Sequence, residues 1–164
     1  MLYIVMLGGR HPRANIEVHD VLFAQADSLE QAYPQLCQAW FGNRAGLHID
    51  SWMEVDGIDH YRVESSDVAP GPDDPRLFFI NFGGYEDRVF GEAHRYLLVV
   101  ARDKADAKQR GKQRLQAASW LKPHTDTVLD VDDCLPIDWV NGRYVHLIEG
   151  SHSGLRQYSD YILL

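Results

Sequence analysis

The feature that most constrains the fold of this chain is a pattern of residues that recurs at an offset of 75 positions. Glu17-x-His19 and Glu92-x-His94 each open an apolar run, and each follows a Gly-Gly pair by the same distance. The matches continue in order through both halves, so tandem duplication explains them far better than coincidence. The alignment places Leu2, Gly8, Gly9, Glu17, His19, Leu22, Ala26 and Ala32 on Leu77, Gly83, Gly84, Glu92, His94, Leu97, Ala101 and Ala107.

A second block of similarity follows after a shift of one residue. HIDSWMEVD (48–56) aligns with HTDTVLDVD (124–132), so that His48 and Asp50 match His124 and Asp126. The second copy then carries an insertion around CLPIDW (134–139). We therefore expect a third strand in each copy, with an equivalent pair of polar residues.

The same order of elements is predicted in each copy. A short apolar strand ends at the Gly-Gly pair, and a second strand follows it. A helix then begins at Asp27-x-x-Glu30 or Asp103-x-x-Asp106, both typical of a capping box. Two further strands turn at Asp56-Gly57 or Asn141-Gly142, which are good hairpin signals. The pattern predicts an α+β fold: two tandem ββαββ repeats with antiparallel sheets, related by a pseudo-two-fold axis.

The predicted boundaries follow from the connector SSDVAPGPDDP, which is rich in Pro, Gly and Asp and has no periodicity. We expect a first repeat over residues 1–64, a linker over 65–76 and a second repeat over 77–149. Residues 150–164 form a C-terminal extension, in which YSDYILL (158–164) is typical of one more edge strand.

Three segments carry a resemblance to a known family. They are LGG-x7-EVHD (7–20), HIDSWMEVD (48–56) and FGGYEDRVFGEAHRYLLVVARDKADA (82–107). The chain resembles a bacterial family catalogued only as a domain of unknown function, number fifteen forty-three, which occurs in one or two copies. The resemblance covers both repeats. It implies a repeat unit and a soluble bacterial protein, and it implies no activity.

Strand alternation places the repeated polar residues on one face of each predicted sheet. Glu17 and His19, like Glu92 and His94, lie opposite a face of small and apolar side chains that suits a covering helix. The first strands are apolar on both faces, so the other repeat or another subunit is expected to cover the open face. A functional cleft is expected between the repeats, where the two Glu-x-His motifs face each other. Its rim would be formed by Gly8, Gly9, Gly83 and Gly84.

Three interpretations of the repeated motif stay open. In the first, the Glu and His side chains are hydrogen-bonded groups with a structural role only. In the second, they bind a small ligand or a divalent metal, with His19, His94, Glu17 and Glu92 as suitable ligands for zinc, manganese or iron. In the third, His19 or His94 is a general base oriented by its neighbouring Glu.

The Gly-Gly pairs are a separate candidate for ligand binding. Gly8-Gly9 and Gly83-Gly84 could form anion-binding nests. Gly-Gly after a strand is more often a turn that requires positive φ.

The composition of the chain argues against some classes of binding partner. The net charge of −8 argues against nucleic acid and anionic membranes as general partners. No apolar run is long enough to span a bilayer and no targeting signal is recognised, so a cytoplasmic location is expected. The sequence predicts a non-enzymatic ligand-binding or protein-interaction module, with a metal-dependent or acid/base enzyme as the alternative. The candidate partners are a second copy of the chain, a small ligand or another protein.

Overall fold

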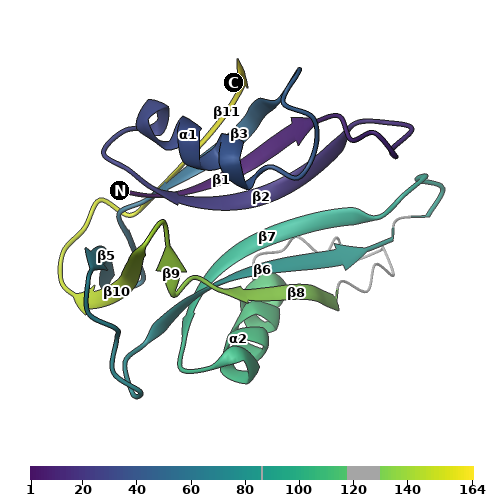
Figure 1. Cartoon of the computed structure of the whole chain (residues 1–164). Helices are drawn as coiled ribbons and strands as arrows, with labels where there is room; N and C mark the ends of the chain where they lie inside the picture. Colours follow the sequence, from purple (N-terminus) through teal and green to yellow (C-terminus); the bar gives the residue numbers. More distant parts are fainter. Residues whose placement is uncertain (86, 118–129) are drawn as a thin grey trace. The chain divides into compact units, whose positions relative to one another are not determined.

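The computed structural model describes residues 1–85, 87–117 and 130–164 (Figure 1). The chain forms two compact units. Unit 1 contains Met1–Ala69 together with Trp139–Leu164, and unit 2 contains Pro70–Asp138. Unit 1 is therefore built from two separate chain segments. The range predicted for the second repeat, 77–149, spans both units, because residues 139–149 belong to unit 1.

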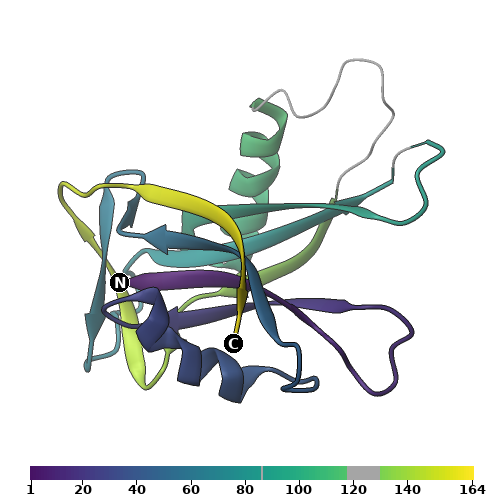
Figure 2. The same ribbon diagram turned by 90° about the horizontal axis from the view of Figure 1, so that it is seen from above.

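The main sheet of unit 1 has four strands in the order β11-β3-β1-β2, and all neighbours are antiparallel. The strands are β1 (Leu2–Gly9), β2 (Val18–Gln25), β3 (His48–Val55) and β11 (Leu155–Leu163). Figure 2 shows the C-terminal strand β11 running beside β3. The segment expected to form an edge strand from residue 158 thus begins at Leu155 and occupies the edge of this sheet.

Helix α1 (Leu29–Ala39) covers one face of the main sheet. The face it covers is the one predicted from strand alternation, because Ala24 is in the core with Val18, Leu22 and Ala26 packed around it. The buried members of this core are Tyr3, Val5, Leu7, Ala24, Leu29, Ala32, Leu36, Trp40, Leu47 and Ile49.

The start of α1 differs by one residue from the predicted cap at Asp27. Ser28 is the N-cap, and its hydroxyl accepts a hydrogen bond from the Gln31 N–H at 3.4 Å. Pro34 lies inside the helix and has no N–H to donate to the carbonyl of Glu30. The helix nevertheless continues to Ala39, held by the packing of Leu36 in the core.

A second, smaller sheet in unit 1 has the order β4-β5-β10-β9. It is formed by β4 (Gly57–Ile58), β5 (Tyr61–Ser66), β10 (Arg143–Glu149) and β9 (Trp139–Val140). The fourth strand expected in each repeat therefore pairs with its counterpart, β5 with β10, instead of extending its own sheet. Asn141 and Gly142 have positive φ and connect β9 to β10, as their sequence predicts. The predicted turn at Asp56-Gly57 is wrong, because Gly57 lies in β4 and the chain turns at Asp59-His60.

Unit 2 has a three-stranded antiparallel sheet in the order β7-β6-β8. Its strands are β6 (Arg76–Gly84), β7 (Ala93–Ala101) and β8 (Asp130–Pro136), and helix α2 (Lys104–Ala117) packs on one face. The core consists of Phe78, Ile80, Phe82, Val99, Ala101, Ala107, Leu115 and Cys134. The fold class is α+β with antiparallel sheets, as predicted.

The two hairpins β1–β2 and β6–β7 have the same register at the offset of 75. Gly8 pairs with His19, and Gly83 pairs with His94. The third strands correspond differently from the sequence alignment, because Gly8 also pairs with His48 whereas Gly83 pairs with Asp130. Each third strand has a register shift at the same place, which leaves Asp50 and Asp132 as the extra residues. His48 and Asp50 therefore correspond to Asp130 and Asp132. The predicted counterparts His124 and Asp126 lie outside the described residues.

Candidate functional site

Gly8 is the centre of a polar cluster on the face of the main sheet that α1 does not cover. Its neighbours across the sheet are His19 on β2 and His48 on β3. An added Cβ at Gly8 would lie 2.5 Å from His48 Nε2 and 2.7 Å from Asp50 Oδ2. The absence of a side chain at this position therefore leaves the space in which the polar groups meet.

The predicted role of the Gly-Gly pairs as turns or anion-binding nests is wrong. Gly8 and Gly9 are the last residues of β1, Gly83 and Gly84 are the last residues of β6, and none of them has positive φ. These four glycines do not form loops. At Gly8, Gly9 and Gly83, they allow side chains of neighbouring residues to approach the backbone closely.

Two imidazoles and two carboxylates form what we call the first-sheet cluster: Glu17, His19, His48 and Asp50. His19 Nε2 lies 3.5 Å from Glu17 Oε1 and 3.3 Å from Asp50 Oδ2. His48 Nε2 lies 3.7 Å from the same Glu17 oxygen and 3.4 Å from Asp50 Oδ1. Nε2 of each imidazole thus faces both carboxylates, so the two rings lie in a region of negative potential.

His48 is the fixed member of the first-sheet cluster. It is the one buried polar or charged residue of the described chain, at 3% exposure, and its ring lies 4.4 Å from that of Tyr161. Its Nδ1 is 2.8 Å from the Gly46 carbonyl oxygen. Because a carbonyl only accepts, Nδ1 carries the proton in this contact, and Nε2 is the ring nitrogen directed at the cluster.

The remaining members differ in exposure. The side chains of His19 and Glu17 are 49% and 42% exposed. Asp50 Oδ2 is buried and accepts no hydrogen bond in the part of the chain that the structure describes, although His19 Nε2 lies 3.3 Å from it. A buried carboxylate oxygen without a donor costs free energy. The first-sheet cluster therefore combines a rigid side, His48 and Asp50, with an adjustable side, Glu17 and His19.

The corresponding place in unit 2 has a different composition. His94 Nδ1 lies 3.6 Å from Asp132 Oδ2 and 3.1 Å from Asn81 Oδ1. A Cβ on Gly83 would collide with Asp132 and lie 2.6 Å from Glu92 Oε1. Asp130 occupies the position of His48. The Asp130 carboxylate is paired with Lys112 of α2 at 2.8 Å, so the place beside Gly83 gathers the carboxylates of Glu92 and Asp132 and one imidazole, whereas unit 1 has two of each.

The structure brings together some predicted site residues and adds others. Glu17 and His19 lie in one cluster, and Glu92 and His94 flank Gly83 in the other unit. The ligands predicted from the sequence do not include His48, Asp50 and Asp132, although the alternation of the third strand indicates the first two. Within the described ranges, no group of three or more His, Cys, Asp or Glu side chains could hold a metal ion as it stands. The described helices include none that is long and apolar enough to cross a membrane.

Comparisons with known proteins give a family and a fold relative. Residues 14–65, which include Glu17, His19, His48 and Asp50, match the family model described as Domain of Unknown Function (DUF1543). The chain is similar to the crystal structure of a protein Il1583 from Idiomarina loihiensis, with 30% sequence identity and a TM-score of 0.73. That similarity covers 98% of this chain and 95% of the other. No curated protein matches the chain.

Proposed function

Because the chain belongs to the family described as Domain of Unknown Function (DUF1543), whose description gives no activity, we propose a function from the chemistry of the site. The protein is a non-enzymatic binding module, and the first-sheet cluster is its binding site. The ligand is a divalent transition-metal cation, alone or as part of a small ligand.

The observation that carries this proposal is the orientation of His48. With Nδ1 donating to the Gly46 carbonyl, its Nε2 is directed at two carboxylates. Metal-binding histidines usually have this arrangement, in which one ring nitrogen donates to a carbonyl and the other binds the metal. A cation between Nε2 and the carboxylates would also give Asp50 Oδ2 a partner.

The separations between donor atoms support a small cation. The four nitrogen–oxygen distances range from 3.3 to 3.7 Å. Ligands at about 2.0–2.2 Å from a tetrahedral zinc ion are roughly 3.3–3.6 Å apart. The described side chains do not form a ready metal site, so Glu17 and His19 must adjust when the cation binds. Their exposure leaves them free to do so.

The test is a calorimetric titration of untagged protein with Zn²⁺ and with Mn²⁺. We expect saturable binding of one cation in unit 1, and we expect His48→Ala to weaken it about 100-fold or more. Loss of a metal ligand should reduce the affinity at least as much as loss of a residue that hydrogen-bonds to a ligand, which costs about 10–100-fold. His94→Ala is the control, because it also removes one imidazole but in unit 2, where His94 is the counterpart of His19. The absence of saturable binding, or an equal loss in both variants, would overturn the assignment.

An acid/base or metal-dependent enzyme is the alternative function. It is favoured by His19, which is half exposed between Glu17 and Asp50 and could act as a general base. Turnover of generic ester or phosphoester substrates by the wild type, abolished in His19→Ala, would support this alternative and refute a purely binding role.

A further inference from the structure

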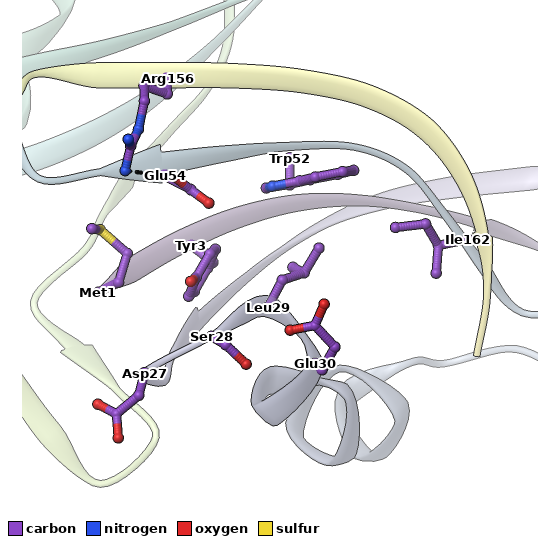
Figure 3. A pocket seen from close by; sticks show the side chains of 10 residues that line it. All are labelled: Met1, Tyr3, Asp27, Ser28, Leu29, Glu30, Trp52, Glu54, Arg156 and Ile162. Carbon is purple, nitrogen blue, oxygen red and sulfur yellow. Dashed lines mark ion pairs between the residues drawn. The ribbon is translucent and has the colours of Figure 1, made fainter.

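A pocket of about 440 Å³ opens on the face of the main sheet opposite the first-sheet cluster, and its volume is within the usual range for small-molecule sites. Figure 3 shows the residues that line it, which come from β1, the start of α1, β3 and β11. All of them belong to unit 1. They are Met1, Tyr3, Asp27, Ser28, Leu29, Glu30, Trp52, Glu54, Arg156 and Ile162.

The ionised side chains around this pocket are mostly acidic. Asp27, Glu30 and Glu54 contribute three carboxylates, against two cations, the Arg156 guanidinium and the N-terminal ammonium group of Met1. The Met1 ammonium group donates to the Ala26 carbonyl at 3.0 Å. Arg156 Nη2 is already paired with Glu54 Oε2 at 2.9 Å. Hydrogen bonds from its own backbone N–H and from the Ser28 hydroxyl keep the pKa of Glu30 below its usual value, so this carboxylate is charged near neutral pH.

The carboxylates around the pocket also affect the pKa of the Tyr3 hydroxyl. Burial raises the pKa of Tyr3, and the nearby carboxylates of Glu54 and Glu30 raise it further. Tyr3 is 3% exposed, and no hydrogen bond to its hydroxyl is found among the described residues. The pocket therefore combines a negative potential with the Tyr3 hydroxyl, and the buried Nε1 of Trp52, another lining residue, has no hydrogen-bond partner among the described residues.

Aromatic and aliphatic surfaces form the rest of the wall. The Trp52 ring is stacked on Tyr158, with ring centres 5.1 Å apart and an angle of 18° between the planes. Trp52 lines the pocket together with Leu29 and Ile162. An indole face beside carboxylates attracts organic cations, because the ring quadrupole adds to the charge interaction.

The N-terminus of α1 could instead suggest an anion site. Here that end of the helix already has its own partners. Ser28 caps the Gln31 N–H, and Glu30 occupies the first turn with its negative charge. A bound anion would have to approach three carboxylates, so a cation is the better match.

We propose that this pocket binds a small organic ammonium ion, a protonated amine with a compact apolar body. The ammonium group lies among Glu30, Asp27 and the Tyr3 hydroxyl, and the apolar body lies against Trp52 and Ile162. This site is separate from the first-sheet cluster, because the two lie on opposite faces of the sheet, and neither assignment depends on the other.

The experiment uses two probes of similar shape, cyclohexylammonium and the uncharged cyclohexanol, with intrinsic tryptophan fluorescence of the full chain as the readout. We expect saturable binding of cyclohexylammonium and binding of cyclohexanol at least tenfold weaker. Trp52→Phe removes the fluorescence response. Glu30→Gln weakens binding roughly 2–5-fold, the size expected for one exposed charge pair.

Glu149→Gln is the matched control, because Glu149 is an exposed residue at the end of β10 and is not part of the pocket lining. We expect it to bind cyclohexylammonium as the wild type does. Equal binding of the two probes, a response that survives in Trp52→Phe, or unchanged affinity in Glu30→Gln would each overturn the proposal.

Discussion

Gly8 shows at the scale of one residue how a missing side chain creates a site. His19, Gly8 and His48 lie side by side on three adjacent strands. Residues opposite each other on neighbouring strands point to the same face, so the two imidazoles converge above Gly8. A larger residue here would fill the space that the ring nitrogens and Asp50 occupy.

We predict that Gly8→Ala destabilises the protein by about 1–3 kcal/mol, the usual cost of overpacking a well-filled site. The new methyl group would displace His48, which is held between the Gly46 carbonyl and the Tyr161 ring. Urea denaturation measures the effect. Gly71→Ala is the control, because its added Cβ would meet only Asp74, at 3.3 Å or more. Equal midpoints for the two variants would contradict the prediction.

At the scale of an element, the start of α2 contains a reciprocal pair of carboxylates. Asp103 Oδ1 accepts from the Asp106 N–H at 2.8 Å, and Asp106 Oδ2 accepts from the Arg102 N–H at 3.1 Å. The Arg110 side chain donates to Asp106 and, with the Arg102 N–H, lowers the pKa of that carboxyl. Asp103 thus caps the helix as predicted, whereas Asp106 accepts from the N–H of Arg102, the residue before the cap.

We predict that Asp106→Asn is less stable than the wild type by about 1 kcal/mol at pH 7. A lowered pKa in the folded state stabilises the protein above the pKa of the unfolded chain, near 4. That contribution disappears as pH falls through the lower folded pKa, so the two proteins should converge in acid. Thermal unfolding between pH 2 and pH 7 measures this, with exposed Asp73→Asn as control. A difference independent of pH would refute the argument.

Local patterns in the sequence predict where the strands and helices lie better than they predict which strands pair. The offset of 75 predicts equivalent β1–β2 and β6–β7 hairpins, since both strands and the connecting loop are close together in the chain. The third strand of unit 2 is misplaced by sequence, because HTDTVLDVD resembles HIDSWMEVD more than the true counterpart, DVDDCLP, does. Register in β8 is set by contacts with β6, including the extra residue Asp132, and short-range similarity carries no information on such contacts.

At the scale of the whole molecule, unit 1 depends on both segments of the chain. β11 pairs with β3, β10 pairs with β5, and Ile162 and Leu164 pack against the core under α1. These pairings join residues about a hundred positions apart, which is why periodicity indicates strands but not their neighbours. The same is true of the first-sheet cluster and of the pocket, where residues from separate elements meet only in the folded sheet.

We predict that a chain ending at Gly154 loses at least about 3 kcal/mol of unfolding free energy. It lacks Ile162 and Leu164, which are partly buried against the core, and exposes the edge of β3. Urea denaturation and light scattering would detect the loss and the accompanying aggregation. Asp160→Ala is the control, because Asp160 is exposed and lies at the irregularity in β11. A truncated chain as stable as the wild type would contradict this view.

The two-segment construction of unit 1 also has a consequence for the order of events on the ribosome. Residue 164 lies 95 positions after residue 69, so the first segment of unit 1 is synthesised well before β11. At a synthesis rate of roughly 5–20 residues per second, β3 and β5 are made about 5–20 s before their partner strands β11 and β10. Unit 2 is complete in the nascent chain during that interval. The unpaired edge of β3 is therefore exposed for longer during synthesis than that of β5, whose partner β10 precedes β11 in the chain.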